Sequence, residues 1–305
     1  MFDFGIVKNI EKIILLMSKI YDELSIISSK LRDVYKKNNE LADEIISIRE
    51  SLISLEKGIQ CQHSEIDVFK QRYIYETLRV GNEKNIFCFP FIGITIKVYL
   101  PFCSFDHIQF TILSSACFFE KDELMLVKNN FLDLNKENVV LDIGSNIGNH
   151  SLFFAKVCNA SVYAFEPQKN LCEIAKFNFE LNSVSDKVEV LNLALGAHRK
   201  AGKYKDFSSQ NTGGTTIEET EFCKEFEMEA LDNFTFEKID FIKIDVEGYE
   251  QEVLKGAAKT LSRINCPIWI EIFPENKEAV TKLLEYYDYC LYIELKNNNY
   301  IYKKK

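Results

Sequence analysis

The chain has 305 residues, 47% of them hydrophobic, and its formal net charge at pH 7 is −9. This composition supports a sizeable core and excludes a disordered chain, and the length predicts about two domains. The negative charge argues against a general nucleic-acid binder, which needs clustered Lys and Arg to neutralise phosphates, and the obvious basic cluster is only residues 303–305.

Cysteine usage and the apolar stretches indicate the compartment. The nine cysteines are scattered and none forms a C-x-x-C pair, so we expect neither a disulfide framework nor a zinc site. This pattern is typical of a reducing environment, and we predict a cytoplasmic protein. The most apolar N-terminal stretch, residues 10–20, contains Glu11, Lys12 and Lys19 and is not followed by a small-residue cleavage site. We therefore expect neither a signal peptide nor a membrane span there.

Residues 1–80 carry a heptad repeat that predicts a long amphipathic helix. Apolar residues alternate at steps of four and three, and no proline interrupts them. The a positions are Ile10, Met17, Leu24, Leu31, Asn38, Ile45, Leu52 and Ile59. Isoleucine predominates at d, which favours trimers or tetramers, whereas an asparagine at a is typical of dimers. We expect a coiled coil that makes a homo-oligomer of open order; a helical hairpin breaking at residues 36–39 is the alternative.

Residues 81–138 are predicted to be a connector that caps the main domain. Residues 86–100 are rich in Phe, Ile and Val and are interrupted by Pro90 and Gly93, a pattern typical of a β-hairpin. Residues 118–127 have the apolar spacing of a helix. The aromatic residues of this segment favour core packing over a cofactor stack.

Residues 139–155 read as a buried strand, a tight glycine loop and a helix. The loop pattern is Asp142-x-Gly144-x-Asn146-x-Gly148. A dinucleotide fingerprint has glycines at its first, third and sixth positions, and this loop lacks the glycines at the third and sixth positions. It also lacks the lysine of a phosphate-binding P-loop. What remains is a ligand with an ammonium and a carboxylate, for which Asp142 would attract the ammonium and the loop amides would meet the carboxylate.

Residues 139–305 form the predicted ligand-binding domain. After the first unit, strands are expected at 161–165, 188–195, 241–244 and 267–272, and helices at 171–181 and 250–261. This alternation predicts a parallel sheet with helices on both faces, and such sheets bind ligands at the carboxyl ends of their strands.

Acidic residues follow three of these strands. Glu166 comes about twenty residues after the first glycine, where a carboxylate accepts hydrogen bonds from ribose hydroxyls. The alternative for Glu166 is a cap for the helix that starts near Pro167. Lys243, Asp245 and Glu247 lie at the end of the 241–244 strand and form a candidate site. Two further acids are Glu250, for which we favour helix capping, and Glu271, which ends the last parallel strand.

Taken together, these motifs resemble the FkbM family of S-adenosylmethionine-dependent methyltransferases. The matching stretches are residues 140–151, 163–167, 192–196 and 242–248, and residues 1–80 fall outside the resemblance. The family implies the class I methyltransferase fold, a Rossmann-like seven-stranded sheet with one antiparallel strand near its end. Residues 289–294 and 299–303 would supply that final hairpin.

The resemblance also implies a site for S-adenosylmethionine. The glycine loop would lie along the methionine part, Glu166 would hold the ribose, and Ala194 and Leu195 would line the adenine side. The residues expected at the cofactor are Glu120, Asp142, Gly144, Ser145, Asn146, Gly148, Asn149, Glu166, Pro167, Ala194, Leu195 and Asp245. The loop at residues 211–215 is expected near the far edge of the cofactor.

The implied reaction is attack of a hydroxyl on the methyl group of a sulfonium, for which the enzyme aligns the reactants and removes a proton. Asp245 is the preferred base or orienting group, with Lys243 and Glu247 beside it. His150 is a second candidate base, and a buried structural histidine is its alternative. A divalent cation such as magnesium or calcium held by Asp245 and Glu271 is possible but not favoured, because no third ligand is evident.

The family link suggests an O-methyltransferase that acts on a hydroxyl of a sugar or of a polysaccharide or natural-product precursor. Two alternative functions stay open. One is a catalytically silent methyltransferase fold that works as a scaffold through its coiled coil. The other is a methyltransferase acting on nitrogen or on a protein side chain.

Overall fold

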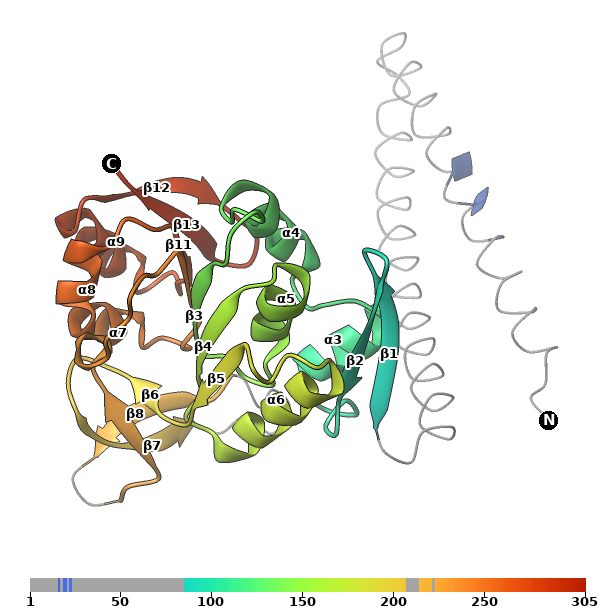
Figure 1. The fold of residues 1–305 in the computed structure, drawn as a ribbon, viewed down its shortest axis with the longest axis horizontal. Helices are drawn as coiled ribbons and strands as arrows, with labels where there is room; N and C mark the ends of the chain where they lie inside the picture. Colours follow the sequence, from blue (N-terminus) through green and yellow to red (C-terminus); the bar gives the residue numbers. More distant parts are fainter. Residues whose placement is uncertain (1–15, 17–18, 21, 24–84, 207–213, 221–222) are drawn as a thin grey trace, which may run out of the picture. The chain divides into compact units, whose positions relative to one another are not determined.

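The computed structural model describes residues 16, 19–20, 22–23, 85–206, 214–220 and 223–305 (Figure 1). The chain divides into two units, Met1–Glu76 and Thr77–Lys305. The five described residues of the first unit are helical. The rest of the heptad repeat lies outside the described residues, so the coiled coil, the homo-oligomer and the boundaries at residues 80 and 138 stay predictions.

A central sheet of seven strands organises the second unit (Figure 1). The strands, in spatial order, are β12 (Tyr289–Glu294), β13 (Asn299–Lys304), β11 (Ile268–Glu271), β10 (Phe241–Ile244), β3 (Val139–Ile143), β4 (Ser161–Phe165) and β5 (Val188–Leu191). Strands β5, β4, β3, β10 and β11 run parallel, whereas β13 is antiparallel to both of its neighbours. The predicted doubly wound sheet with one antiparallel strand near its end is confirmed.

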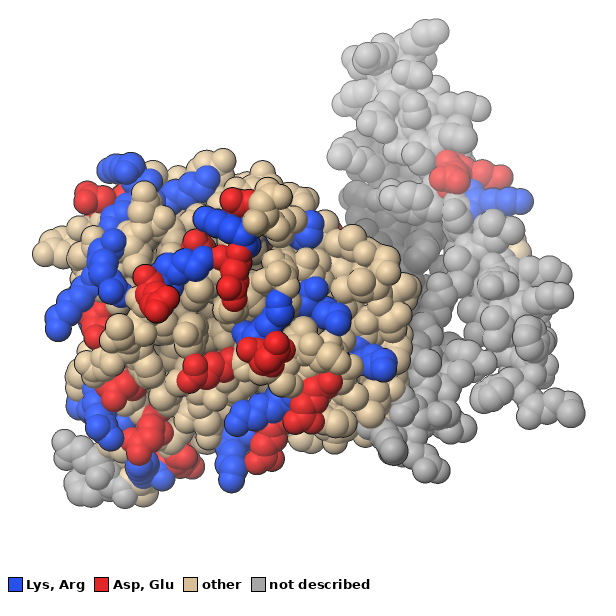
Figure 2. Space-filling model, in the orientation of Figure 1, with Lys and Arg blue, Asp and Glu red and all other residues tan. Residues whose placement is uncertain are grey.

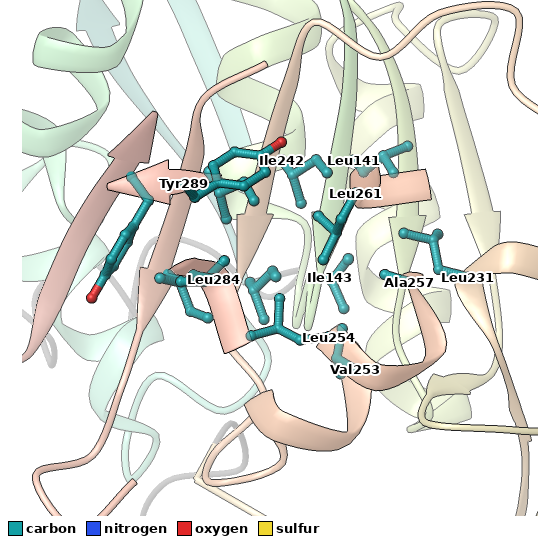
Figure 3. Close-up of a cluster of buried hydrophobic side chains, with 14 of the residues drawn as sticks. Leu141, Ile143, Leu231, Ile242, Val253, Leu254, Ala257, Leu261, Leu284 and Tyr289 are labelled. Atoms are coloured by element: carbon teal, nitrogen blue, oxygen red, sulfur yellow. The ribbon is translucent and has the colours of Figure 1, made fainter. Parts of the chain in front are cut away.

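Helices cover the two faces of this sheet (Figure 1). They are α4 (Lys121–Asn130), α5 (Asn149–Val157) and α6 (Lys169–Leu181) on one face, and α7 (Glu250–Gly256), α8 (Ala258–Arg263) and α9 (Lys277–Tyr286) on the other. Figure 3 shows the apolar core under α7, α8 and α9, to which Leu141, Ile143 and Ile242 contribute from the sheet. None of the described helices is long and apolar enough to cross a membrane.

The two faces of the sheet differ in polarity because side chains alternate along each strand. In β10, Ile242 and Ile244 enter the core under α7 to α9, whereas Phe241 packs against Phe154 of α5 with ring centroids 5.9 Å apart. Lys243 therefore also faces α5, and it lies in register with Asp142 of β3. The α5 face of the sheet thus carries buried charges, and the opposite face is apolar.

The connector folds as predicted in part. The hairpin is confirmed as β1 (Ile86–Phe91) and β2 (Ile94–Tyr99). It is attached to α6, because the amide of Tyr99 donates to Oδ1 of Asn178 (2.6 Å) and the amide of Lys97 donates to Oδ1 of Asn182 (3.0 Å). The helix α3 (His107–Ser115) was not predicted, and α4 starts three residues later than the pattern indicated.

A second sheet was missed. It has four strands in the order β6-β9-β7-β8, namely β6 (Ala194–Leu195), β9 (Phe226–Glu229), β7 (Lys200–Asp206) and β8 (Thr216–Thr220). The single predicted strand at 188–195 was wrong, since β5 ends at Leu191 and the chain turns into β6. Asn192 stabilises that turn, because its Nδ2 donates to the carbonyls of Glu166 and Pro167 (both 2.9 Å).

The predicted helix at 250–261 is likewise two helices, α7 and α8, which meet at Ala257. On the surface drawn in Figure 2, Lys and Arg are interspersed with Asp and Glu and do not gather into one positive patch. This part of the described surface therefore has no stripe suited to phosphate neutralisation.

Candidate functional site

A cavity that is partly open to solvent lies at the carboxyl ends of β3, β4 and β10. These ends meet at one edge of the sheet because the three strands are parallel. A pocket at this edge is where open α/β sheets bind their ligands. The cavity is therefore the candidate site, and its wall can be described group by group.

The turn between β3 and α5 is held closed by hydrogen bonds of its own. The amides of Gly144 and Ser145 both donate to the carbonyl of Phe165 at the end of β4 (2.9 and 3.0 Å). The amide of Asn146 donates to Oε2 of Glu166 (2.9 Å). The expectation that these loop amides meet the carboxylate of a ligand is wrong, because they already have acceptors. The first turn of α5 is the remaining source of N–H groups.

The two glycines of the turn are required by internal packing. A Cβ on Gly144 would lie 1.7 Å from the carbonyl oxygen of Asp245, and one on Gly148 would lie 2.6 Å from Cζ of Phe179 in α6. Both glycines also have left-handed backbone conformations, with φ of +84° and +80°. Neighbouring protein atoms therefore fill the space beside both glycines.

Glu166 lies at the tip of β4 and points to the turn after β3. It is 5% exposed, and its Oε1 accepts from the amide of Gln168 (2.8 Å) while Oε2 accepts from Asn146. Burial raises the pKa of Glu166 to about 7, although the two amide hydrogen bonds act against this rise. The acid and the turn are thus joined, as expected for a ribose site, and the ribose contact itself stays a prediction.

Two buried oxygen atoms beside the turn have no hydrogen-bond partner in the described part of the chain: Oδ1 of Asp142 and Oγ of Ser145. The other carboxylate oxygen of Asp142 accepts from the hydroxyl of Ser151 in α5 (2.6 Å). Buried polar atoms without partners are uncommon in folded proteins. Ser145 lines the cavity, so a polar ligand would satisfy groups that the protein leaves open.

A buried ion pair forms the floor of the cavity. Nζ of Lys243, a residue only 1% exposed, donates to Oδ2 of Asp245 at 2.8 Å. Burial opposes the charge of the lysine, but the carboxylates of Asp245, Asp142 and Glu120 outweigh burial and raise the pKa of Lys243. Burial likewise acts to raise the pKa of Asp245, and the neighbouring lysine lowers it overall. Both partners are therefore ionised.

The remaining carboxylates of the site are harder to ionise. Burial and the charge of Asp245 raise the pKa of Glu271 to about 9, so Glu271 keeps its proton and donates it in a hydrogen bond to Asp245. Burial and Asp245 also raise the pKa of Glu247 to about 7. Glu247 lines the cavity in a left-handed conformation (φ 51°). It is a carboxylate that changes ionisation near neutral pH.

The segment before α4 is anchored to the first turn of α5. The side chain of Asn149 exchanges two hydrogen bonds with the backbone of Phe119, both 3.1 Å long. Oε2 of Glu120 lies 3.0 Å from Nε2 of His150. Oε1 of Glu120 accepts from Nδ2 of Asn299 (3.2 Å). Glu120 therefore holds residues around the site and does not form its wall.

Most of the residues predicted from the sequence lie together in the wall of the cavity. They are Gly144, Ser145, Asn146, Asn149, His150, Glu166, Pro167, Ala194, Leu195, Lys243, Asp245 and Glu247. Glu120, Asp142, Gly148 and Glu271 are not part of the wall. Asp142 faces α5 and Gly148 faces α6, while Glu120 and Glu271 bind other polar residues of the site.

Within the described ranges, no group of three or more His, Cys, Asp or Glu side chains is placed to hold a metal ion. Asp245 and Glu271, the pair considered for magnesium or calcium, are joined instead by a hydrogen bond from the protonated Glu271 to Asp245. The geometry therefore gives no support to the metal alternative.

Sequence reasoning missed wall residues that come from other parts of the chain: Ile108, Phe119, Gln168, Tyr204 and Ile217. Gln168 follows the matched motif at residues 163–167 directly, so its position was a usable signal. Tyr204 and Ile217 come from the second sheet, for which the sequence carried no signal that we used.

The strand order, the glycine turn and the acid at the tip of β4 define the class as a doubly wound α/β protein with the methyltransferase type of sheet. Residues 142–302, more than half of the chain, match the Methyltransferase FkbM domain. The chain belongs to the FkbM methyltransferase family.

Three similar proteins illustrate the match. The chain is 32% identical over 162 residues to the hexuronic acid methyltransferase AglP of Haloferax volcanii, covering 50% of this chain and 63% of that protein. It is 27% identical over 155 residues to the methyltransferase sdnD of Sordaria araneosa, covering 38% of this chain and 59% of that one. The chain thus spans less than two thirds of either curated relative. A crystal structure of methyltransferase FkbM from Methylobacillus flagellatus aligns with TM-score 0.40 and 16% identity, over 55% of this chain and 43% of that one.

We predict that Gly144→Ala destabilises the protein by about 4 kcal/mol or more, because the new Cβ must displace the end of β10. Gly93→Ala is the matched control, since Gly93 has a similar φ of +79° but nothing within 4 Å of its added Cβ. It should lose only about 1 to 2 kcal/mol, for the left-handed conformation alone. Urea denaturation of the full chain measures both. Equal losses would contradict the close packing at Gly144.

Lys243→Met should lower the free energy of unfolding by about 3 to 5 kcal/mol, because it leaves Asp245 and Asp142 buried without their cation. Lys282→Met is the control, since the Lys282 side chain is 70% exposed. Its expected effect is below about 0.5 kcal/mol. The same urea titration applies, and a Lys243 variant as stable as the control would show that the ion pair is not needed.

Proposed function

We propose that this chain is an S-adenosylmethionine-dependent O-methyltransferase that acts on a hydroxyl of a sugar-containing acceptor. The observation that supports the cofactor most directly is the bond between Glu166 and the amide of Asn146. It puts an acid at the tip of β4 against the turn after β3, the arrangement in which doubly wound sheets bind the ribose of a nucleoside.

The polar groups of the cavity fit this cofactor. S-adenosylmethionine carries a sulfonium and an ammonium against one carboxylate, so it is a cation and suits an acidic site. Oγ of Ser145, without a partner in the described part of the chain, offers an acceptor in the cavity wall at the methionine side. Asp142 lies outside the wall and would attract the ammonium only through its charge. Leu193, Ala194 and Leu195 provide an apolar wall beside Glu166 for the adenine. When bound, the cofactor supplies the electrophilic methyl group.

Glu247 is the better candidate for the base. Oδ2 of Asp245, the residue preferred from the sequence, already accepts from Lys243, and the pKa of Asp245 is lowered, so it takes up a proton poorly. Glu247 lines the same cavity and has a pKa of about 7, close to the working pH at which a base is most effective. In this proposal Glu247 would take the proton of the acceptor hydroxyl, and the bound cofactor would supply the methyl group and leave as its thioether. Asp245 holds Lys243 and orients the site.

The family and the name of one relative, a hexuronic acid methyltransferase, support a sugar-containing acceptor. A scaffold without turnover fits less well, because it needs neither open acceptors at the methionine side nor a carboxylate with a pKa near 7. Transfer to nitrogen is a second outcome that a labelled-methyl assay would reveal.

Glu166→Gln should weaken the binding of S-adenosylmethionine about ten- to a hundredfold, the loss expected for hydrogen bonds to a charged group. Cofactor binding favours the ionised carboxylate, whose pKa in the free protein is about 7. Affinity of the wild type should therefore rise from pH 6 to pH 8, and the glutamine variant should lose that rise. Isothermal titration calorimetry at the two pH values measures both effects.

Glu180→Gln makes the same chemical change on the exposed side of α6 and should behave as the wild type. A Glu166 variant with unchanged affinity and unchanged pH dependence would remove Glu166 from the ribose site. A well-folded wild type that binds no cofactor at either pH would favour the scaffold.

A further inference from the structure

We infer that the acceptor group entering this site is uncharged, so that the enzyme selects a neutral sugar hydroxyl and rejects the carboxylate of a uronic acid. The inference rests on the proposed methyltransferase function and narrows its substrate class. It also distinguishes the acceptor of this chain from the hexuronic acid for which one relative is named. Three observations on the cavity lead to it.

The first is the sign of the charges in the wall. Among the described residues, the cavity is lined by the carboxylates of Glu166, Asp245 and Glu247, and Lys243 is its one Lys or Arg. Asp245 is ionised, and Glu166 and Glu247, each with a pKa of about 7, are ionised in part, so their negative charges roughly balance the positive charges of Lys243 and of the cofactor. The loaded wall therefore has no positive charge left for an anionic acceptor, and an acceptor carboxylate beside Asp245 would be a like charge, which is disfavoured.

The second observation is that Lys243 already forms an ion pair with Asp245. Nζ of Lys243 donates to Asp245 at 2.8 Å, and the side chain of Lys243 is 2% exposed. Recognition of a carboxylate relies on an accessible Arg or Lys, with Arg able to bind it through two hydrogen bonds. Lys243 offers a uronate no such contact, since moving it would leave Asp245 without its cation.

The third observation is that carboxylates at this site are hard to ionise. Burial and the charge of Asp245 both act against ionisation of Glu247 and of Glu271. A substrate carboxylate brought beside Asp245 would meet the same burial and the same neighbouring charge. Binding of a further anion at this site is therefore unfavourable.

The chemistry of the two acceptors points the same way. A carboxylate is ionised at neutral pH and attacks a methyl group without a base, whereas a hydroxyl must lose its proton during the attack. Glu247, partly exposed in the cavity wall, is placed to take that proton. For a uronate acceptor Glu247 would serve no purpose and would repel the substrate.

The test compares matched acceptors with the full chain and S-adenosylmethionine labelled in its methyl group. Each pair consists of a methyl hexoside and the methyl glycoside of the corresponding uronic acid, in the gluco, galacto and manno series. We expect transfer to at least one hexoside, at a rate at least tenfold above that of its uronoside. Transfer to a uronoside at the rate of its hexoside or faster would overturn the inference, as would transfer to neither while the cofactor still binds.

The variant Glu247→Gln sharpens the comparison. It should lower transfer to the hexoside about a hundredfold through loss of the base, and it should raise transfer to the uronoside through loss of a negative charge. Glu278→Gln, whose side chain is 83% exposed on α9, is the control and should leave the preference unchanged. Equal losses on both acceptors in the Glu247 variant would contradict the inference. Calorimetry with S-adenosylmethionine alone keeps a failure of the proposed function distinct, because that failure removes cofactor binding itself.

Discussion

The buried ion pair between Lys243 and Asp245 is the interaction on which the site depends. Alternation along β10 puts Ile242 and Ile244 into the apolar core and turns Lys243 towards α5, where it is 1% exposed. A buried ammonium is tolerated only with partners, and here Asp245, Asp142 and Glu120 provide them from three different parts of the chain. The pair therefore couples the strand ends to the segment before α4.

Burial and this ion pair together set the protonation of the other carboxylates. Burial is the largest cause of the raised pKa values of Glu271 and Glu247, and Asp245, kept ionised by Lys243, raises both further. Beside the ionised Asp245, Glu271 is protonated and Glu247 changes its protonation near pH 7. The site thus contains both a fixed carboxylate and a carboxylate that can act as a base. The same anion makes the cavity suited to a cationic cofactor and unsuited to an anionic acceptor.

The strand pattern and the grouping of the site residues could be predicted from the sequence. The strands 161–165 and 241–244 were predicted with their observed bounds, because each is a short apolar run bounded by polar or turn residues. Placing Glu166 beside the glycine turn required only that parallel strands end at one edge of the sheet. The hairpin 86–99 was readable for the same local reasons, with Gly93 at its turn.

What the sequence could not reveal depends on contacts between distant residues. The amides of Gly144 and Ser145 are bound by Phe165, and the space beside Gly148 is filled by Phe179, so the loop chemistry expected from the motif is altered by its neighbours. The proton on Glu271 depends on Asp245, which lies on another strand end. The second sheet pairs β6 with β9 across more than thirty residues, a pairing with no local signal.

The central claim is that the turn after β3 and the acid at the tip of β4 together bind a sulfonium nucleoside. A crystal structure of the full chain with S-adenosylhomocysteine tests it most directly. We predict the adenosyl group across the carboxyl ends of β3 and β4, with both ribose hydroxyls within hydrogen-bond distance of the Glu166 carboxylate. A ligand bound elsewhere, or a Glu166 that contacts only the amides of Asn146 and Gln168 in the complex, would contradict the account.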